Sequence, residues 1–235
     1  MRSKLALVLA TLVAATAAAA AQNVLVVHDP TRTAAERKLT TAERRIFERD
    51  ALPAVRKSIK PEVCEESLQD AGVIRGSFSE PGKRQSLIFY EYCQSGNGFG
   101  WNGLVLIEGD MVTGNFISEG GWGMSIEPVS DINQNGVQEF TLSYSGGLHQ
   151  GVGGVGVDLM EFVGGIPIGL GWYKAEAFGP TEASTSWKLT AKPGKVPVYY
   201  KQKFYSAEGR KPRPVGGNSP TKLGKTFVSK FEVVK

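Results

Sequence analysis

The chain has 235 residues, of which 27 are Lys or Arg and 23 are Asp or Glu, giving a formal net charge of +4. This length suits one folded domain that is large enough to bury a proper core. The small excess of positive charge argues against a dedicated nucleic-acid binder, which would present a strongly basic surface.

The first 21 residues have the three parts of a secretory signal peptide. A basic start at residues 1–4 precedes an apolar run at residues 5–13, and small residues at 17–21 form a cleavage region. The run is too short for a retained membrane helix, and no later segment has the apolar length that a membrane span requires. We therefore expect cleavage after Ala21 and a protein that is periplasmic or secreted from a bacterium.

Residues 22–71 form an N-terminal segment that we expect to be mostly helical. A possible edge strand at residues 24–27 comes first, and residues 33–60 are rich in Ala, Glu and Arg. Apolar side chains recur there at helical spacing and predict an amphipathic helix packed on a sheet; they are Leu39, Ala42, Ile46 and Phe47. Pro53 has no amide hydrogen, so a break or kink is expected after Asp50.

The chain contains two cysteines, Cys64 and Cys93. In an oxidising compartment we expect them to form one disulfide. Only His28 and His149 could join them in a zinc site, and neither histidine has the spacing of a metal ligand.

From residue 72 to residue 205 the sequence changes to short strands separated by glycine turns. Apolar and polar alternation predicts strands at residues 86–92, 104–108, 111–117, 138–144, 155–162, 170–175 and 196–204. Hairpin turns are expected at Gly109 and at Gly164 with Gly165. The predicted fold class is mainly β, built of antiparallel sheets with an N-terminal α-helix.

The most informative segment is the loop at residues 131–139. It has oxygen-bearing side chains at its positions 1, 3, 5 and 9 and a glycine at position 6, namely Asp131, Asn133, Asn135, Glu139 and Gly136. Ca²⁺ takes six to eight oxygen ligands, and alternate residues of a tight loop can converge on one point, joined by the carbonyl of Val137. Position 12 is Leu142, not the glutamate of an EF-hand, and the residues after Glu139 alternate as in a strand.

A calcium loop that runs straight into a strand resembles the loop of FG-GAP or VCBS-type repeats, the units of integrin-α-like β-propellers. The usual pattern of these repeats is Asp-x-Asp-x-Asp-Gly-x-x-Asp. The resemblance assigns the side-chain ligand positions to Asp131, Asn133, Asn135 and Glu139. Two aspartates are replaced by asparagines here, which predicts weak Ca²⁺ affinity, in the range of about 10⁻⁴–10⁻³ M. The alternative is an Asx-rich turn that needs no metal.

A faint repeat surrounds this loop. Gly82, Gly136 and Gly194 each precede a predicted strand, at separations of 54 and 58 residues. Such spacing is blade-like, but three units are fewer than the four or more blades of a closed propeller. The sequence therefore predicts an incomplete propeller or a twisted sandwich.

Catalytic motifs are not evident in the sequence. Residues 151–156 match Gly-x-Gly-x-x-Gly, but strand-like residues follow them, so we interpret the segment as a glycine hairpin and not a dinucleotide site. Carboxylates available for glycoside hydrolysis are Glu108, Asp110, Glu119, Glu127 and Glu161, and nothing in the sequence singles out a pair.

Three tryptophans lie next to glycine and are candidate ligand-binding aromatics: Trp101, Trp122 and Trp172. Backbone bends at glycine could expose their rings to sugars or peptides, although Trp more often fills a core between sheets.

The C-terminal end is strongly basic. Residues 201–235 hold nine Lys or Arg against Glu208 and Glu232. We expect residues 206–235 to form a solvated, loosely ordered tail with a possible final strand at 225–233.

Two functions of different classes remain open on these grounds. The first is an exported, calcium-stabilised, non-enzymatic binding or structural module of the bacterial cell envelope, whose partner would be an envelope polysaccharide or protein. The second is an exported hydrolase that acts on polysaccharide or peptidoglycan. The two differ in whether paired carboxylates face each other across a cleft.

Overall fold

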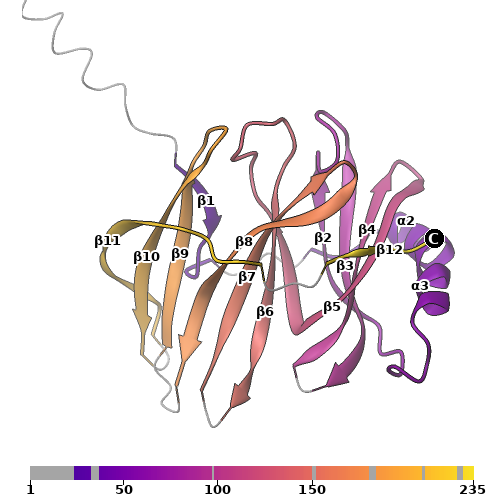
Figure 1. The fold of residues 1–235 in the computed structure, drawn as a ribbon, viewed down its shortest axis with the longest axis horizontal. Coiled ribbons are helices and arrows are strands. Elements are labelled where there is room, and N and C mark those ends of the chain that lie inside the picture. The colour runs from indigo at the N-terminus through magenta and orange to yellow at the C-terminus, as the bar shows by residue number, and fades with distance from the viewer. Residues whose placement is uncertain are drawn as a thin grey trace, which may run out of the picture.

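The computed structural model describes residues 24–32, 37–96, 98–149, 152–179, 184–207, 210–226 and 230–235. The predicted signal peptide lies outside these residues. Within them the protein is mainly β, with a short helical layer near the N-terminus, as predicted (Figure 1). No helix in the described ranges is long and apolar enough to cross a membrane.

Strands β2 to β11 form one antiparallel meander in which each strand pairs with its neighbours in sequence. They are β2 (Gln69–Gly76), β3 (Gln85–Gly96), β4 (Phe99–Glu108), β5 (Met111–Pro128), β6 (Phe140–His149), β7 (Val152–Val163), β8 (Ile166–Phe178), β9 (Ser184–Lys192), β10 (Val198–Ser206) and β11 (Arg213–Thr221). Two strands lie off this path: β1 (Leu25–His28) pairs with β9, and β12 (Glu232–Val233) pairs with β5.

The long strand β5 belongs to two sheets. Its first part, up to Gly121, pairs with β4, and its last part, from Trp122, pairs with β6. We call β2, β3, β4, β12 and the first part of β5 the first sheet, and the remaining strands the second sheet. Aromatic side chains from the two sheets meet in a shared core, where the rings of Phe116 and Phe162 lie 5.8 Å apart.

The helical layer covers the first sheet at one end of the molecule (Figure 1). It consists of α2 (Thr41–Ile46), a π-helical turn η1 (Phe47–Ala51) and α3 (Leu52–Ser58). The irregularity predicted after Asp50 is this π turn, and Pro53 follows at the start of α3, where a missing amide hydrogen is tolerated. The ring of Phe47 packs on Tyr90 of β3 at a centroid distance of 5.0 Å.

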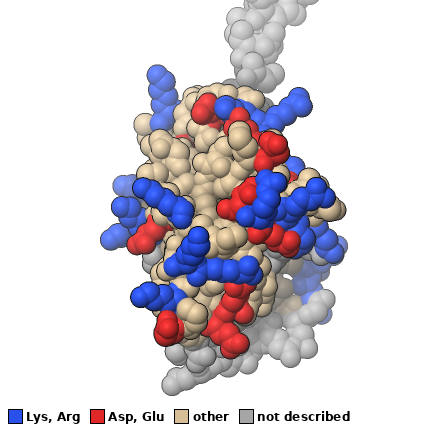
Figure 2. Space-filling view, turned by 90° about the vertical axis from the view of Figure 1, so that its right-hand side faces the viewer, with Lys and Arg blue, Asp and Glu red and all other residues tan. Residues whose placement is uncertain are grey.

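One residue of the predicted apolar stripe is placed differently. Ala42 is exposed, and the neighbouring Glu43 is buried instead. Glu43 forms a capping box with Thr40 and also reaches Arg75 of β2, so its charge is compensated beneath the helix. The outer surface of this side of the molecule mixes acidic and basic side chains (Figure 2).

The predicted glycine repeat does not appear in the strand pattern. Gly82, Gly136 and Gly194 precede β3, β6 and β10, so the intervals contain three and then four strands. Gly82 and Gly136 have positive φ angles, whereas Gly194 does not. The three connections instead meet in space, because the amide of Gln138 bonds to Ser77 O (2.7 Å) and that of Gly194 bonds to Ile132 O (2.9 Å).

The C-terminal residues belong to the fold. Strand β11 pairs along β10, the yellow ribbon after it runs over the second sheet to β8, where Gly224 pairs with Trp172, and residues 232–233 form β12 on the first sheet (Figure 1). The predicted final strand is reduced to the two residues of β12 among those described.

Candidate functional site

The loop at residues 129–139 connects β5 to β6 and is anchored by its apolar residues. Ile132 is fully buried, together with Val129, among side chains of β7, β8 and β9. A backbone hydrogen bond from Gly194 to Ile132 fixes the loop against the β9–β10 connection. The polar side chains of the loop are therefore held in place by a core that runs directly beneath them.

The Asx side chains of the loop close a tight turn. The Asp131 carboxylate accepts hydrogen bonds from the backbone amides of Asn135 (3.1 Å) and Gly136 (2.8 Å). The side-chain oxygens of Asn133 and Asn135 accept from the amides of Asn135 (3.2 Å) and Val137 (2.9 Å). Gly136 has φ +93°, the left-handed backbone predicted for position 6. These bonds confirm the turn, and an Asx turn forms such bonds with or without a metal.

Glu139 is fully buried below this turn. Its carboxylate accepts hydrogen bonds from the backbone amides of Ile132 (2.9 Å) and Asn133 (3.3 Å). Burial, and to a smaller extent the nearby charge of Glu161, raises the pKa of Glu139 to about 7 against the opposing effect of these amides. Among the described residues, no Lys, Arg or His forms an ion pair with this group.

Glu161 of β7 is a second buried carboxylate at the loop. The register that pairs Phe140 with Met160 places Glu161 beside Glu139 on the adjacent strand. Its carboxylate accepts from the side-chain amides of Asn133 (3.0 Å) and Asn135. The sequence analysis counted Glu161 only among possible hydrolytic carboxylates, because the pairing register of β6 with β7 cannot be read from the loop motif.

The side-chain oxygens of this loop are of the kind that a hard cation prefers, although the carboxylates alone are not arranged as a metal site. Within the described ranges, no group of three or more His, Cys, Asp or Glu side chains is arranged to hold a metal ion. A calcium ion would therefore need neutral oxygens as well, from Asn133, Asn135 and the carbonyl of Val137. The two asparagine amide nitrogens now face Glu161, so those amides would have to turn over to present oxygen.

The predicted disulfide is present and lies beside the helical layer, in the same core cluster. Cys64 and Cys93 are bonded, with their Cα atoms 5.9 Å apart. The bond ties the segment after α3 to β3, and Glu66 in the same segment forms a bidentate ion pair with Arg56 of α3 (2.7 and 2.9 Å).

The three candidate tryptophans have different surroundings. Trp101 is partly buried against the core cluster beneath the helices. Trp172 lines a cavity of about 360 Å³ between β8 and β9, together with Trp187, which the sequence analysis did not select. The side chain of Trp122 lies outside the described part of the structure. Trp187 is flanked by Ser186 and Lys188, so a search for tryptophan beside glycine misses it.

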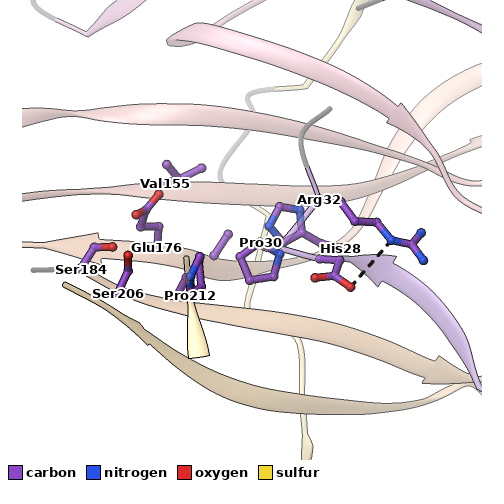
Figure 3. Close-up of a pocket in the computed structure, with 11 residues that line it drawn as sticks. His28, Pro30, Arg32, Val155, Glu176, Ser184, Ser206 and Pro212 are labelled. Atoms are coloured by element: carbon purple, nitrogen blue, oxygen red, sulfur yellow. Dashed lines mark ion pairs between the residues drawn. The ribbon is translucent and has the colours of Figure 1, made fainter. Parts of the chain in front are cut away.

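A second cavity, of about 270 Å³, lies between β1 and the ends of β8, β9 and β10 (Figure 3). His28 and Glu176 contribute to its lining. Burial lowers the pKa of His28, which the nearby Asp29 opposes only in part. Burial would raise the pKa of Asp29, but hydrogen bonds from Lys188 and Thr31 lower it to about 2, and Lys188 lies 2.7 Å away.

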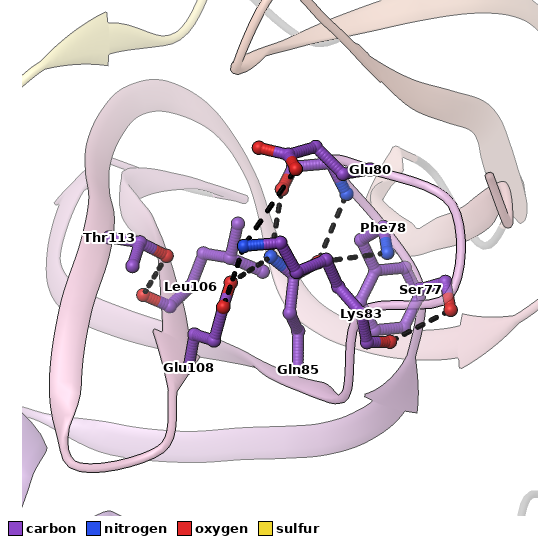
Figure 4. Close-up of polar contacts among 9 residues, drawn as sticks. Ser77, Phe78, Glu80, Lys83, Gln85, Leu106, Glu108 and Thr113 are labelled. Carbon is purple, nitrogen blue, oxygen red and sulfur yellow. Dashed lines mark hydrogen bonds and ion pairs between the residues drawn. The ribbon is translucent and has the colours of Figure 1, made fainter.

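The five carboxylates considered for hydrolysis line neither of these two cavities. Glu108 forms an ion pair with Lys83 (2.7 Å) and accepts a hydrogen bond from the side-chain amide of Gln85 (3.2 Å), as Figure 4 shows. Glu119 accepts from Ser95 (2.9 Å), and Glu161 belongs to the loop. In the second cavity Asp29 is held by Lys188 and Arg32, which leaves Glu176 as the lining carboxylate without such a cation pair among the described residues.

Comparisons of the chain with protein-family models, curated proteins and solved structures give no match. The resemblance to calcium-loop repeats therefore rests on the loop and the strand that follows it, residues 131–144.

Proposed function

We propose that this protein is an exported, calcium-stabilised, non-enzymatic binding or structural module of the bacterial cell envelope. The observation that carries the calcium part is the pair of buried carboxylates, Glu139 and Glu161, beneath a turn rich in side-chain oxygens. The Cys64–Cys93 disulfide agrees with an oxidising compartment, as does the leader-like sequence at residues 1–21.

The physical argument is electrostatic. Two carboxylates on adjacent strands are removed from water, and among the described residues neither has a cationic partner. Backbone and asparagine amides offset part of this cost, and protonation of Glu139 offsets more. Ca²⁺ would replace that proton with a charge that both carboxylates share, with Asp131, Asn133, Asn135 and the Val137 carbonyl available as further oxygen ligands.

The alternative, an exported hydrolase, has less support. Hydrolysis of glycosides needs two carboxyl groups about 5–10 Å apart across a cleft. Of the five carboxylates considered for this role, Glu108 pairs with Lys83 and Glu161 belongs to the loop, and none of the five lines either described cavity.

Thermal unfolding in calcium tests the proposal. Calcium at ten times its Kd should stabilise the protein by about 1.4 kcal/mol, which corresponds to a rise in Tm of roughly 3–6 °C for a chain of this size. Chelator should reverse the rise. Asp131→Ala and the isosteric Glu161→Gln should abolish it, whereas Asp110→Ala, at an exposed hairpin acid, should leave it intact.

A wild-type Tm that does not respond to calcium up to about 10 mM would contradict the proposal, because that concentration exceeds the weak end of extracellular sites. Equal calcium responses in wild type and Glu161→Gln would place the metal elsewhere.

A further inference from the structure

The cavity between β8 and β9 arises because these neighbouring strands separate. Among the described residues they pair with each other at one end, where residues 176–178 meet residues 184–186, and beyond that end β1 pairs with β9 at residues 189–191. On the β8 side the segment after β11 closes over the opening, through hydrogen bonds from Trp172 N to Gly224 O (2.9 Å) and from Gly224 N to Trp172 O (2.7 Å). This crossing segment is part of the yellow ribbon in Figure 1.

Two half-buried indoles line the opening, Trp172 from β8 and Trp187 from β9. Tyr173 and Leu189 contribute to the lining from the core side. A cavity with aromatic walls suits a small ligand that carries a flat apolar face.

The charged residues of the lining are all lysines: Lys174 of β8, Lys201 of β10 and Lys222 of the crossing segment. All three are exposed, and no ion pair with a described acidic residue is formed by any of them. The lining contains no Asp or Glu. Three like charges from three separate segments create a positive potential at the mouth, which attracts an anionic group.

We propose that this cavity binds a carboxylated sugar unit of an acidic polysaccharide. The carboxylate would lie among the lysines, and the sugar ring would pack on Trp172 and Trp187. The volume of about 360 Å³ lies at the small end of ligand sites, which suits one ring of a longer chain. This inference rests on the proposed binding role and specifies its ligand class.

Titration with trigalacturonate, followed by tryptophan fluorescence and calorimetry, tests the inference on the mature chain. The matched ligand is the methyl-esterified trimer, which has the same rings without the charges. We expect the acid trimer to bind at least about fivefold more tightly than the ester, and to bind more weakly in high salt. Inorganic phosphate at the same concentration should not compete.

Variants assign the binding to this cavity. Lys201→Gln combined with Lys222→Gln should lower the affinity for the acid trimer by about fivefold or more. Trp187→Ala should lower this affinity at least as much. Lys192→Gln, at an exposed lysine on β9 outside the lining, should bind as wild type does. The lysine variants change exposed side chains only, so they test the site without disturbing the core.

Equal affinity for the acid and ester trimers, absence of binding, or unchanged binding in the lysine double variant would overturn the inference. Competition by phosphate alone would show a general anion site and would also overturn it. The titration is performed with calcium and with chelator. Binding without any calcium effect on Tm would contradict only the calcium proposal, whereas a calcium effect without binding would contradict only the sugar site.

Discussion

Two buried glutamates, Glu43 in the helical layer and Glu139 at the end of the 129–139 loop, reach opposite electrostatic states. Glu43 accepts hydrogen bonds from Arg75 (2.5 and 2.9 Å), Ser86 (2.6 Å) and Thr40 (2.7 Å). Burial would raise the pKa of Glu43, but these donors, Arg75 first, lower it to about 2. Glu139 is buried more completely and has only amide donors, and its pKa rises to about 7.

The difference shows that the partners, and not burial alone, decide whether a buried carboxylate keeps its charge. Glu43 of the helical layer has Arg75 of β2 as its cation, and the Cys64–Cys93 bond ties the segment after α3 to β3. The loop supplies no cation from the described residues, and a second carboxylate, Glu161, lies beside it. This difference is why we propose an external cation at the loop and none at Glu43.

Removing the disulfide should give the largest effect and should affect only the helical side. Replacing Cys64 and Cys93 together by Ala should lower the free energy of unfolding by about 3–4 kcal/mol, because the bond restricts a 29-residue separation in the unfolded chain. Urea unfolding measures this loss, and reductant added to wild type is the control. Any calcium response should persist in the double variant. A loss below about 1 kcal/mol would show that the bond contributes little.

Glu43→Gln tests the internal ion pair. Removing one charge of a buried pair costs about 3–5 kcal/mol, and the low end applies here because Glu43 is buried but the Arg75 side chain is 48% exposed. We expect a loss of about 3 kcal/mol at pH 7, measured by urea unfolding. Glu48→Gln, at an exposed site on the same helical segment, should change stability little. Equal stability of the two variants would mean that the capping hydrogen bonds of residue 43 do not need its charge.

The main features of the fold follow from local patterns in the sequence. Alternating residues mark most strands of the meander, and Gly109, Gly164 and Gly165 have positive φ in the hairpins where they were predicted. The disulfide follows from the two cysteines and the expected compartment. The Thr40–Glu43 capping box was also readable from its spacing, although the apolar stripe drew attention to Ala42 instead.

The features that sequence reasoning missed depend on contacts between distant segments. Strand β11 contains Pro214 and Pro220 and is exposed, which is compatible with an edge strand but gives no periodic signal. Strands β2 and β9 are polar enough to resemble loops. Glu161 and Trp187 gain their importance from strand register and from the separation of β8 and β9, neither of which a single sequence specifies.

The pH dependence of Glu139 sharpens the comparison at the loop. The pKa of Glu139 in the folded state, about 7, lies above the ordinary value of 4.5. The stability that the protonated group contributes is therefore fully present below pH 4.5 and is lost as the pH rises through 7. The Glu43 contribution has the opposite sign and is lost only as the pH falls from 4.5 toward 2. The free energy of unfolding of Glu139→Gln, taken relative to wild type, should therefore be higher at pH 8 than at pH 5 by about 2–3 kcal/mol.

Urea unfolding at the two pH values measures that difference, and Glu119→Gln, at an exposed carboxylate on β5, is the control. Parallel pH profiles for wild type and Glu139→Gln would show that Glu139 remains charged at neutral pH without a cation.

Calcium and protons should compete for this site, which gives the smallest of these effects. Calcium needs the ionised carboxylate of Glu139, so at pH 5.5 a proton must leave a group whose pKa is about 7. That requirement weakens affinity roughly thirtyfold. A calcium concentration that stabilises by about 1.4 kcal/mol at pH 8 should then stabilise by only about 0.2 kcal/mol. Asn133→Asp, which adds charge at position 3, should increase the response at pH 8. Melting curves at the two pH values measure both changes, and a calcium response of equal size at pH 5.5 and pH 8 would show that Glu139 is not a ligand.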